Sequence, residues 1–542
     1  MMLKPFTHPW GEGLEGTPLK IISMIGACAG FLTFGLLALY DQGIANALTQ
    51  NPDFFKTMPR LADDTTVLGT VLALFVLGAM FGCLTMSAIG NKYGRRPLIL
   101  FATVTTLVGA GGMAGANGLA CFCVMRIVNG FGVGILTSIV PTYVGEISKP
   151  RIRGMMMSLE LVAAATGLAT SFWVAWGFRH EKGPLGWRLS IAIQAFILLF
   201  TLVTMLFAPE SPRWLMEAGR VEEGRRVLAR LHGQAFADAA TLEIQDAIAV
   251  EHAAQRGKGY AECFANNDQC FRYRTFLAIG VNAAQQLTGF VFSPSESSSS
   301  LIVDNPHAYS SINMATYYSA NILINSVGMT PDKAVFVLGF LGVAGWVFML
   351  GGAFVLMEGV GRVRTMIIGA AGCCVGQILL AAGVAHQESK AAGYVATAGL
   401  FLFLCIFSAT HLPTAFVYSS EIVPLAIRTR SATLGVAVQY ILNFVVVMVV
   451  PTAIPGMGGW GFYALFAGIN GLMVPVLYFL CPEVSGLTLE GVDELFAGGK
   501  VVMRRTVKVD DNGRIGGKTL HQLEANKEQG SFEHVEKVES GY

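Results

Sequence analysis

Residues 66–97 read TVLGTVLALFVLGAMFGCLTMSAIGNKYGRRP, and no charged residue occurs between Thr66 and Lys92. An apolar run of about 20 residues is long enough to cross the roughly 30 Å hydrocarbon core of a bilayer as an α-helix. Because every backbone polar group within lipid must be paired internally, such a run cannot cross as irregular chain. The stretch is therefore predicted to be a transmembrane helix.

The same kind of apolar run recurs along the whole chain, and it predicts an all-α membrane protein with twelve transmembrane helices. An even number of spans places both termini on one side of the membrane. The expected spans are 20–40, 66–90, 97–116, 118–144, 156–178, 187–208, 275–326 (interrupted), 334–357, 364–386, 392–418, 428–452 and 460–481.

The composition agrees with this class and argues against others. Of the 542 residues, 53% are hydrophobic and 13% are charged, whereas soluble domains have about a quarter charged. A formal net charge of +1 argues against a nucleic-acid partner. The ten cysteines lie mostly inside apolar runs, so we interpret them as small core residues rather than a disulfide framework. We expect no cofactor, no metal and no enzymatic activity.

Lys and Arg residues indicate the orientation. They are concentrated in the connections after even-numbered spans and in the long segment 209–274. The positive-inside rule therefore places both termini and this segment in the cytosol, and we expect the plasma membrane. The predicted parts are a cytosolic N-terminus (1–20), an N-terminal six-helix half (21–208), a cytosolic linker with amphipathic helices (209–274), a C-terminal six-helix half (275–497) and a disordered cytosolic tail (498–542).

Three charged motifs occur twice, in the same order and at similar separations, which indicates two parallel six-helix repeats. The matching motifs are Gly94-Arg95-Arg96 with Gly361-Arg362, Glu146 and Arg153 with Glu421 and Arg428, and Pro209-Glu210 with Pro482-Glu483. Repeats of this kind place a solute site near the membrane midplane, between halves that rock to open it to alternate sides.

Over about 25–496 the chain resembles the sugar porter family of the major facilitator superfamily, in its fungal form. The motifs that carry the resemblance are Tyr40-Asp41-Gln42-Gly43, Gly94-Arg95-Arg96, Arg126 with Gly130 and Gly134, Glu146 through Arg153-Gly154, Pro209-Glu210-Ser211-Pro212-Arg213-Trp214-Leu215, Gln285-Gln286-Leu287-Thr288-Gly289, Tyr418 through Glu421 to Arg428, and Pro482-Glu483 through Leu489-Glu490. The resemblance implies transport of a monosaccharide or related polyol across the bilayer, by proton symport or by facilitated diffusion.

Asp41 and Arg126 are the sharpest candidates for proton coupling. Each lies in an otherwise apolar span, where a charge costs at least about 2.5–3.5 kcal/mol. The resemblance implies that they pair and that Asp41 carries the proton. The alternative is that Asp41 lies at an outer helix end and is simply solvated.

Charged residues in the cytoplasmic connections are predicted to form a gate whose ion pairs hold the two halves shut. The set is Arg95, Arg96, Glu146, Arg153, Glu210, Arg213, Glu358, Arg362, Glu421 and Arg428. Such pairs need only bias a two-state equilibrium by a few kcal/mol.

A planar amide offers two donors and an acceptor, which suits vicinal hydroxyl groups. The predicted solute-binding residues are Gln285, Gln286, Asn313, Tyr317, His411, Gln439 and Tyr440. Several depart from the family pattern: the span-ten Trp position is His411, and the span-eleven Asn-Trp position is Gln439-Tyr440. His411 is either a site residue or a packed neutral histidine.

The motif Gln285–Gly289 is followed by a Ser-rich stretch, 290–311, before Ile312-Asn313. This polar segment with two prolines cannot cross lipid as a helix. Its removal restores an unbroken helical pattern, so we interpret it as a retained intron in the gene model, with a genuine loop as the alternative. As given, we expect an irregular excursion with helix resuming near Ile312.

The altered solute set leaves two other functions open. One is a transporter of quinate- or inositol-type polyols, and the other is a non-transporting sugar sensor that signals through 498–542. Uptake assays separate them, because a sensor binds its sugar without accumulating it.

Overall fold

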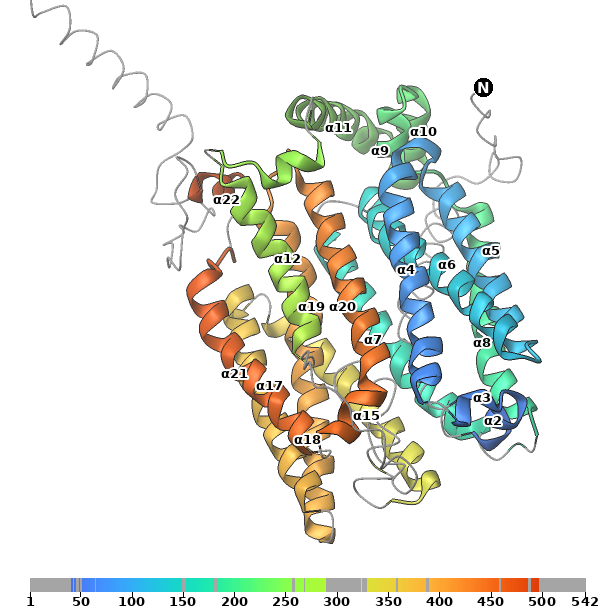
Figure 1. The fold of residues 1–542 in the computed structure, drawn as a ribbon. Coiled ribbons are helices and arrows are strands. Elements are labelled where there is room, and N and C mark those ends of the chain that lie inside the picture. The colour runs from blue at the N-terminus through green and yellow to red at the C-terminus, as the bar shows by residue number, and fades with distance from the viewer. Residues whose placement is uncertain are drawn as a thin grey trace, which may run out of the picture.

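The structure is a computed structural model. It describes residues 40, 41, 43, 44, 48, 51–63, 65–148, 153–178, 181, 183–255, 259–267, 269–288, 323, 329–356, 359–386, 389–457, 460–485 and 489–496. The described residues form helices and connections without any strand, arranged as a tall bundle with shorter helices at both ends (Figure 1). The predicted termini, the tail and the stretch 290–311 lie outside this part of the chain.

The N-terminal half contains five long helices, preceded by five described helical residues at and beyond the end of the predicted first span: Tyr40, Asp41, Gly43, Ile44 and Leu48. The helices are α4 (Thr65–Tyr93), α5 (Arg95–Ala114), α6 (Leu119–Ile147), α7 (Arg153–Phe178) and α8 (Leu185–Phe207), with α2 (Pro52–Thr57) and α3 (Arg60–Asp63) before them. Each begins and ends within a few residues of the predicted span.

The C-terminal half repeats this arrangement. Its helices are α12 (Phe271–Leu287), α15 (Pro331–Gly351) continued by the π-helix η4 (Gly352–Leu356), α17 (Arg362–Ala385), α18 (Lys390–Ala409), α19 (His411–Ile422), α20 (Arg428–Gly456), α21 (Trp460–Leu480) and the short α22 (Leu489–Leu495). Among the described residues, nine segments are long and apolar enough to span a membrane, and a shorter apolar helix covers Val162–Phe178.

Span ten differs from the expected single helix, because it breaks at Thr410 and continues to Ile422. Pro413 has no N–H and cannot donate to the carbonyl of Ala409. That carbonyl lies against Gly352, where an added Cβ would come within 2.0 Å of the oxygen. The close approach explains why a glycine stands at the start of the π-helical turn.

The linker forms α9 (Pro212–Glu217), α10 (Val221–His232), α11 (Gln234–Gln255) and the 3-10 helix η2 (Tyr260–Phe264). These short helices lie across one end of the bundle (Figure 1). His232 Nε2 lies 3.0 Å from the carbonyl oxygen of Ile147, which ties α10 to the end of α6. We call this end of the bundle the linker side and the opposite end the far side.

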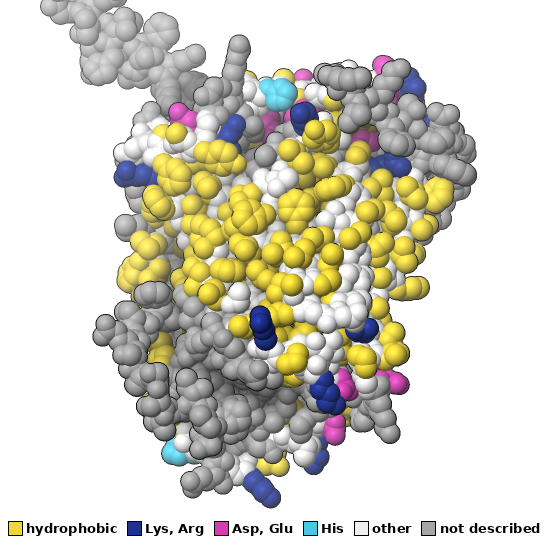
Figure 2. All heavy atoms as spheres, turned by 45° about the vertical axis from the view of Figure 1, so that its right-hand side comes forward, with side chains coloured by type: hydrophobic (Ala, Val, Ile, Leu, Met, Phe, Trp, Pro, Cys, Tyr) yellow, Lys and Arg dark blue, Asp and Glu magenta, His cyan; other side chains and the backbone are white. Residues whose placement is uncertain are grey.

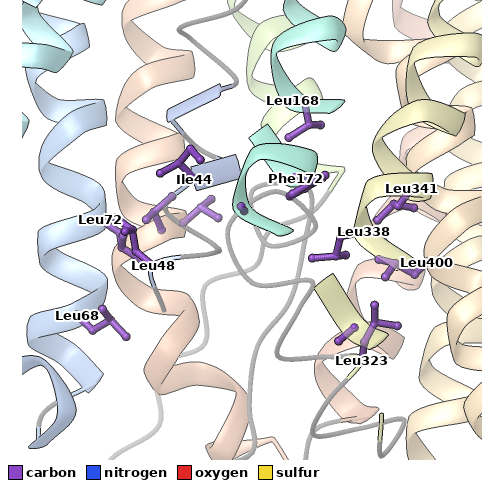
Figure 3. Close-up of a cluster of buried hydrophobic side chains, with 14 of the residues drawn as sticks. Ile44, Leu48, Leu68, Leu72, Leu168, Phe172, Leu323, Leu338, Leu341 and Leu400 are labelled. Atoms are coloured by element: carbon purple, nitrogen blue, oxygen red, sulfur yellow. The ribbon is translucent and has the colours of Figure 1, made fainter. Parts of the chain in front are cut away.

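The two halves pack through α4 against α20 and through α7 against α15. On the far side, one buried apolar cluster draws residues from both halves, among them Leu72 of α4, Phe172 of α7 and Leu338 of α15 (Figure 3). On the linker side the buried clusters are separate: one contains Ile139 and other N-terminal residues, and the other contains Tyr418 and other C-terminal residues. The structure is therefore closed by shared packing at its far side.

The outside of the bundle is apolar over its middle. Large hydrophobic side chains such as Phe101, Phe196, Phe340 and Leu472 are half or more exposed. Figure 2 shows a broad hydrophobic band on one face, with charged side chains gathered towards the two ends. An apolar surface of this extent on the long helices fits contact with lipid.

Candidate functional site

Asp41 and Arg126 form a buried ion pair inside the N-terminal half. Arg126 Nη1 of α6 lies 3.2 Å from Asp41 Oδ2 of the first span. The two residues are 2% and 1% exposed, so the reading of Asp41 as a solvated helix end is wrong. The guanidinium also lies over the ring of Phe75, 5.6 Å from its centroid. Within the part of the chain that the structure describes, Arg126 Nε and Nη2 have no hydrogen-bond partner.

Two side-chain amides that the sequence analysis did not select extend this pair into a hydrogen-bond network. Gln194 of α8 donates to Asp41 Oδ1 at 3.2 Å, and Asn129 of α6 donates to Gln194 Oε1 at 3.3 Å. Both amides are fully buried. Their signal was the one that identified Asp41, namely a polar side chain inside an apolar span.

A second polar group joins α12 to α20 in the C-terminal half. Gln439 Nε2 donates to Gln285 Oε1 at 3.0 Å, while Gln285 Nε2 makes long contacts of 3.4 Å with the carbonyls of His411 and Leu412. Gln286 is also buried. The structure thus brings Gln285 and Gln439 together, as the solute-site hypothesis requires.

Tyr440 reaches across to the N-terminal half, where its hydroxyl lies 3.3 Å from the hydroxyl of Thr137 on α6. Asn443, one turn beyond Gln439 on α20, is a further buried amide that the sequence analysis did not select. Among the described residues, Gln439 Oε1 and Asn443 Oδ1 have no hydrogen-bond partner. Buried acceptors without partners are costly, so they mark a place where a ligand's hydroxyl groups would be favoured.

The backbone carbonyl of His411 contacts Gln285 Nε2 at 3.4 Å, and the buried Nε2 of its ring has no hydrogen-bond partner among the described residues. Its ring stacks on Phe407 of α18, with 6.0 Å between ring centroids. A Cβ added at Gly369 of α17 would lie 3.0 Å from His411 Cδ2. The ring therefore packs among α17, α18 and α19, and the role of His411 in solute binding stays a prediction.

Asn313, Tyr317 and Glu358 lie outside the described residues. Arg153 begins α7, and its side chain is also outside them.

The charged residues of the first half's motif contact other residues of the same motif. Arg95 Nε and Nη2 donate to the two carboxylate oxygens of Glu146, at 3.0 and 2.9 Å. Glu210 accepts from the backbone N–H of Arg95, Arg96 and Ser211, at 3.0, 3.2 and 2.8 Å, and so satisfies free donors at the start of α5. Burial raises the pKa of Glu210, and these N–H donors oppose that shift. Arg96 itself donates to the carbonyls at the end of α8.

The second half contains the same motif. Arg362 pairs with Glu421 at 3.1–3.2 Å, and Glu483 accepts from the backbone N–H of Arg362 and Val363. Gly94 and Gly361 precede the two arginines with φ of 88° and 102°, a left-handed conformation that favours glycine. Two tyrosines outside the predicted gate set complete the repeat: Tyr143 donates to the carbonyl of Pro209, and Tyr418 to that of Pro482.

In this structure, which is closed on its far side, Arg95 pairs with Glu146 and Arg362 pairs with Glu421, and the predicted ionic gate between the halves stays a prediction. Each pair joins two helices of one half, α5 with α6 and α17 with α19.

Arg213 and Arg428 also make contacts outside any seam between the halves. Arg213 pairs with Glu251 of α11 at 2.6 Å, within the linker. Arg428 Nε donates to the carbonyl of Val423 at 3.3 Å, at the start of α20.

Comparison with known proteins gives the family. The family described as Sugar (and other) transporter matches residues 27–295 and 303–496, leaving 296–302 within the Ser-rich stretch unmatched. Sugar transporter STL1 of Saccharomyces cerevisiae is 31% identical over 510 residues, covering 91% of this chain and 83% of the relative. High glucose sensor RGT2 of the same yeast is 28% identical and matches 88% of this chain, which spans 60% of the sensor's length.

The solved structures agree on the fold. The proton:xylose symporter XylE, bound to 6-bromo-6-deoxy-D-glucose, superposes with a TM-score of 0.68 at 22% identity, covering 88% of this chain and 99% of that structure. The two-repeat fold predicted from the sequence is thereby confirmed. The family match likewise confirms a transporter rather than an enzyme. The chain belongs to the sugar transporter family of the major facilitator superfamily.

Proposed function

We propose that this transporter carries a monosaccharide or related polyol by alternating access, coupled to the movement of a proton. The observation that carries the proposal is the buried Asp41–Arg126 pair. A carboxylate paired with Arg⁺ stays ionised, whereas loss of that partner in an apolar environment favours protonation. A rocking motion that changes the contact between the first span and α6 would therefore load or release a proton.

The solute-binding role falls to the amides on α12 and α20. Gln285 and Gln439 form a donor and acceptor surface, and Gln439 Oε1 and Asn443 Oδ1 are left without partners in the described part of the chain. Hydroxyl groups of a sugar or polyol would supply the missing donors, and the amide nitrogens would donate in return. Tyr440, next to Gln439 on α20, contacts Thr137 of the N-terminal half, which supports a solute site beside the seam between the halves.

The packing supports alternating access. The large buried cluster shared by both halves closes the far side, whereas the large clusters on the linker side each belong to one half, and a small cluster of Val162, Ala165 and Met349 joins α7 to α15. With the linker in the cytosol, this arrangement corresponds to a state closed towards the outside. We place both termini and the linker in the cytosol, at the plasma membrane, on the distribution of Lys and Arg. Epitope tags at either terminus should stain only permeabilised cells, and staining of intact cells would reverse the orientation.

Uptake by purified protein in proteoliposomes tests the function. A panel of radiolabelled hexoses, pentoses, disaccharides, polyols and quinate should contain at least one solute that accumulates when the outside is acidified. Accumulation of quinate or inositol alone would select the cyclic polyol alternative.

A sugar sensor is the second candidate, because RGT2 is 28% identical over 88% of this chain. A sensor would bind one of the sugars with no uptake and no counterflow. That result would overturn the transport proposal.

A further inference from the structure

Three buried polar groups form a closed triangle at the end of α12. Gln377 Nε2 of α17 donates to the backbone carbonyl of Thr288 at 3.0 Å, and Asn470 Nδ2 of α21 donates to the same carbonyl at 2.7 Å. Asn470 Nδ2 also lies 2.8 Å from Gln377 Oε1. The side chains of Gln377 and Asn470 are 3% and 0% exposed.

The triangle satisfies a helix end that lies within the bundle. The last four carbonyls of an α-helix have no partner in the helix itself, and a buried end requires other donors. No water or lipid group can serve inside the membrane core, where each unpaired backbone group costs several kcal/mol. Two side-chain amides on one carbonyl therefore stabilise the last turn of α12.

This last turn carries the proposed solute amides. Thr288 donates through its hydroxyl to the carbonyl of Gln285 at 2.7 Å, and its N–H donates to the carbonyl of Ala284 at 2.8 Å. Gln285 and Gln286 lie within one turn of the clamped carbonyl. If that carbonyl were released, the turn that orients both amides would lose its fixed end.

The other half has a matching contact. Gln194 of α8 donates to Asp41 in the first span, as Asn470 of α21 donates to Thr288 in the seventh. Gln194 lies 15 residues before Pro209 and Asn470 lies 12 residues before Pro482, so the two amides stand about one turn apart in depth. In each half, a side-chain amide on the last helix hydrogen-bonds to the part of the first helix that carries proposed functional residues.

We infer that Gln377 and Asn470 are positioning residues for solute binding, which act by clamping the Thr288 carbonyl and so orienting Gln285 and Gln286. The inference rests on the proposed solute site, and it adds two residues that touch no solute themselves.

Hydrogen exchange tests the clamp without any solute. Full-length protein carrying Asn470→Leu or Gln377→Met, in detergent or nanodiscs, is compared with wild type by mass spectrometry. Amides of 284–288 should exchange at least about fivefold faster, as expected for loss of one buried hydrogen bond, while those of α5 stay unchanged. Cys373→Ala, at a fully buried site one turn before Gln377, is the control and should leave 284–288 unchanged. Unchanged exchange at 284–288, or equal loosening of all helices in both variants, overturns the clamp.

A double-mutant cycle tests the link to binding. D-xylose and D-glucose are the probes, and dissociation constants are measured on folded protein for wild type, Asn470→Leu, Gln285→Ala and the double variant. Asn470→Leu should weaken binding about tenfold alone and less than about twofold in the Gln285→Ala background, because the two act through one site. If Asn470 had only a structural role, its replacement would lower the amount of folded protein without changing the dissociation constant.

The possible failures are distinguishable. Equal tenfold losses in both backgrounds overturn the positioning role and leave the solute site standing. If Gln285→Ala binds the probes as tightly as wild type, the proposed solute site is wrong, and with it the positioning role. If neither sugar binds wild type, the exchange measurement alone decides whether the clamp exists.

Discussion

Replacing Asp41 with Asn should uncouple transport from the proton without preventing the conformational cycle. The Asn side chain has nearly the shape of a protonated Asp, so it fixes the site in a permanently neutral state. Exchange of solute across the membrane needs no net proton movement in that state. Accumulation against a gradient does need it, and should be lost.

The size of the effect follows from the buried pair. At 3.2 Å and an effective dielectric constant of about 20, the attraction between Asp41 and Arg126 is about 5 kcal/mol. Removal of one partner of a buried pair costs about 3–5 kcal/mol, mostly because the other charge is left alone. The Asn variant should therefore be less stable, while the Gln194 amide and the Phe75 ring still contact the site.

The assay compares accumulation with counterflow in proteoliposomes. One proton moving through 100 mV supplies about 2.3 kcal/mol, which supports a solute ratio of about 50-fold. Wild type should approach that ratio under an imposed potential and lose it with a protonophore. Asp41→Asn should reach a ratio of one, with counterflow retained.

Asp53→Asn is the matched control. Asp53 lies on the far side of the same half, and its hydrogen bond from Lys56 holds the pKa of the carboxyl below its usual range. Because Asp53 stays ionised at working pH, its replacement should leave accumulation unchanged. Protonophore-sensitive accumulation in Asp41→Asn at the wild-type level would refute the coupling role.

Three further predictions test the packing and the sequence. Glu146→Gln should lower the melting temperature more than Glu421→Gln, because the Arg95–Glu146 pair is more deeply buried than the Arg362–Glu421 pair. The side chains of the first pair are 8% and 9% exposed and those of the second are 18% and 26% exposed. The reverse order in a thermal melt would contradict this prediction. Gly342→Ala should lower uptake, since an added Cβ would lie 2.7 Å from the Cα of Ala169 and would push α15 away from α7; uptake at the wild-type level would show that this seam does not need such close packing. Sequencing the mature transcript should show 290–311 absent, and a peptide containing Ser297 through Ser300 in the purified protein would establish a genuine insertion.

The helices and the central charge pair were predictable because the membrane imposes them. Lipid allows only long apolar helices, so the composition of each span fixed its place to within a few residues. Asp41 and Arg126 could be identified for the same reason, because a charged side chain inside a membrane span has a high free-energy cost. Gln194, Gln377 and Asn470 have the same signal in weaker form, since an amide costs less than a charge. Their partners could not be predicted, because a backbone carbonyl such as that of Thr288 leaves no mark on the sequence.

The charged motifs of the two halves show how repeated motifs should be interpreted. Arg95 and Glu146 occur together in one repeat, and Arg362 and Glu421 occur together in the other. Because each repeat contains both residues of the ion pair, the pair can form within one repeat, as it does in the structure. A contact between halves instead joins unlike residues, as Thr137 joins Tyr440. The charged motifs therefore stiffen each half as a unit, and the equilibrium between open and closed states depends on the seams of α4 with α20 and α7 with α15. Substitutions at those seams should shift transport rates at constant stability, whereas substitutions in the charged motifs should lower stability first.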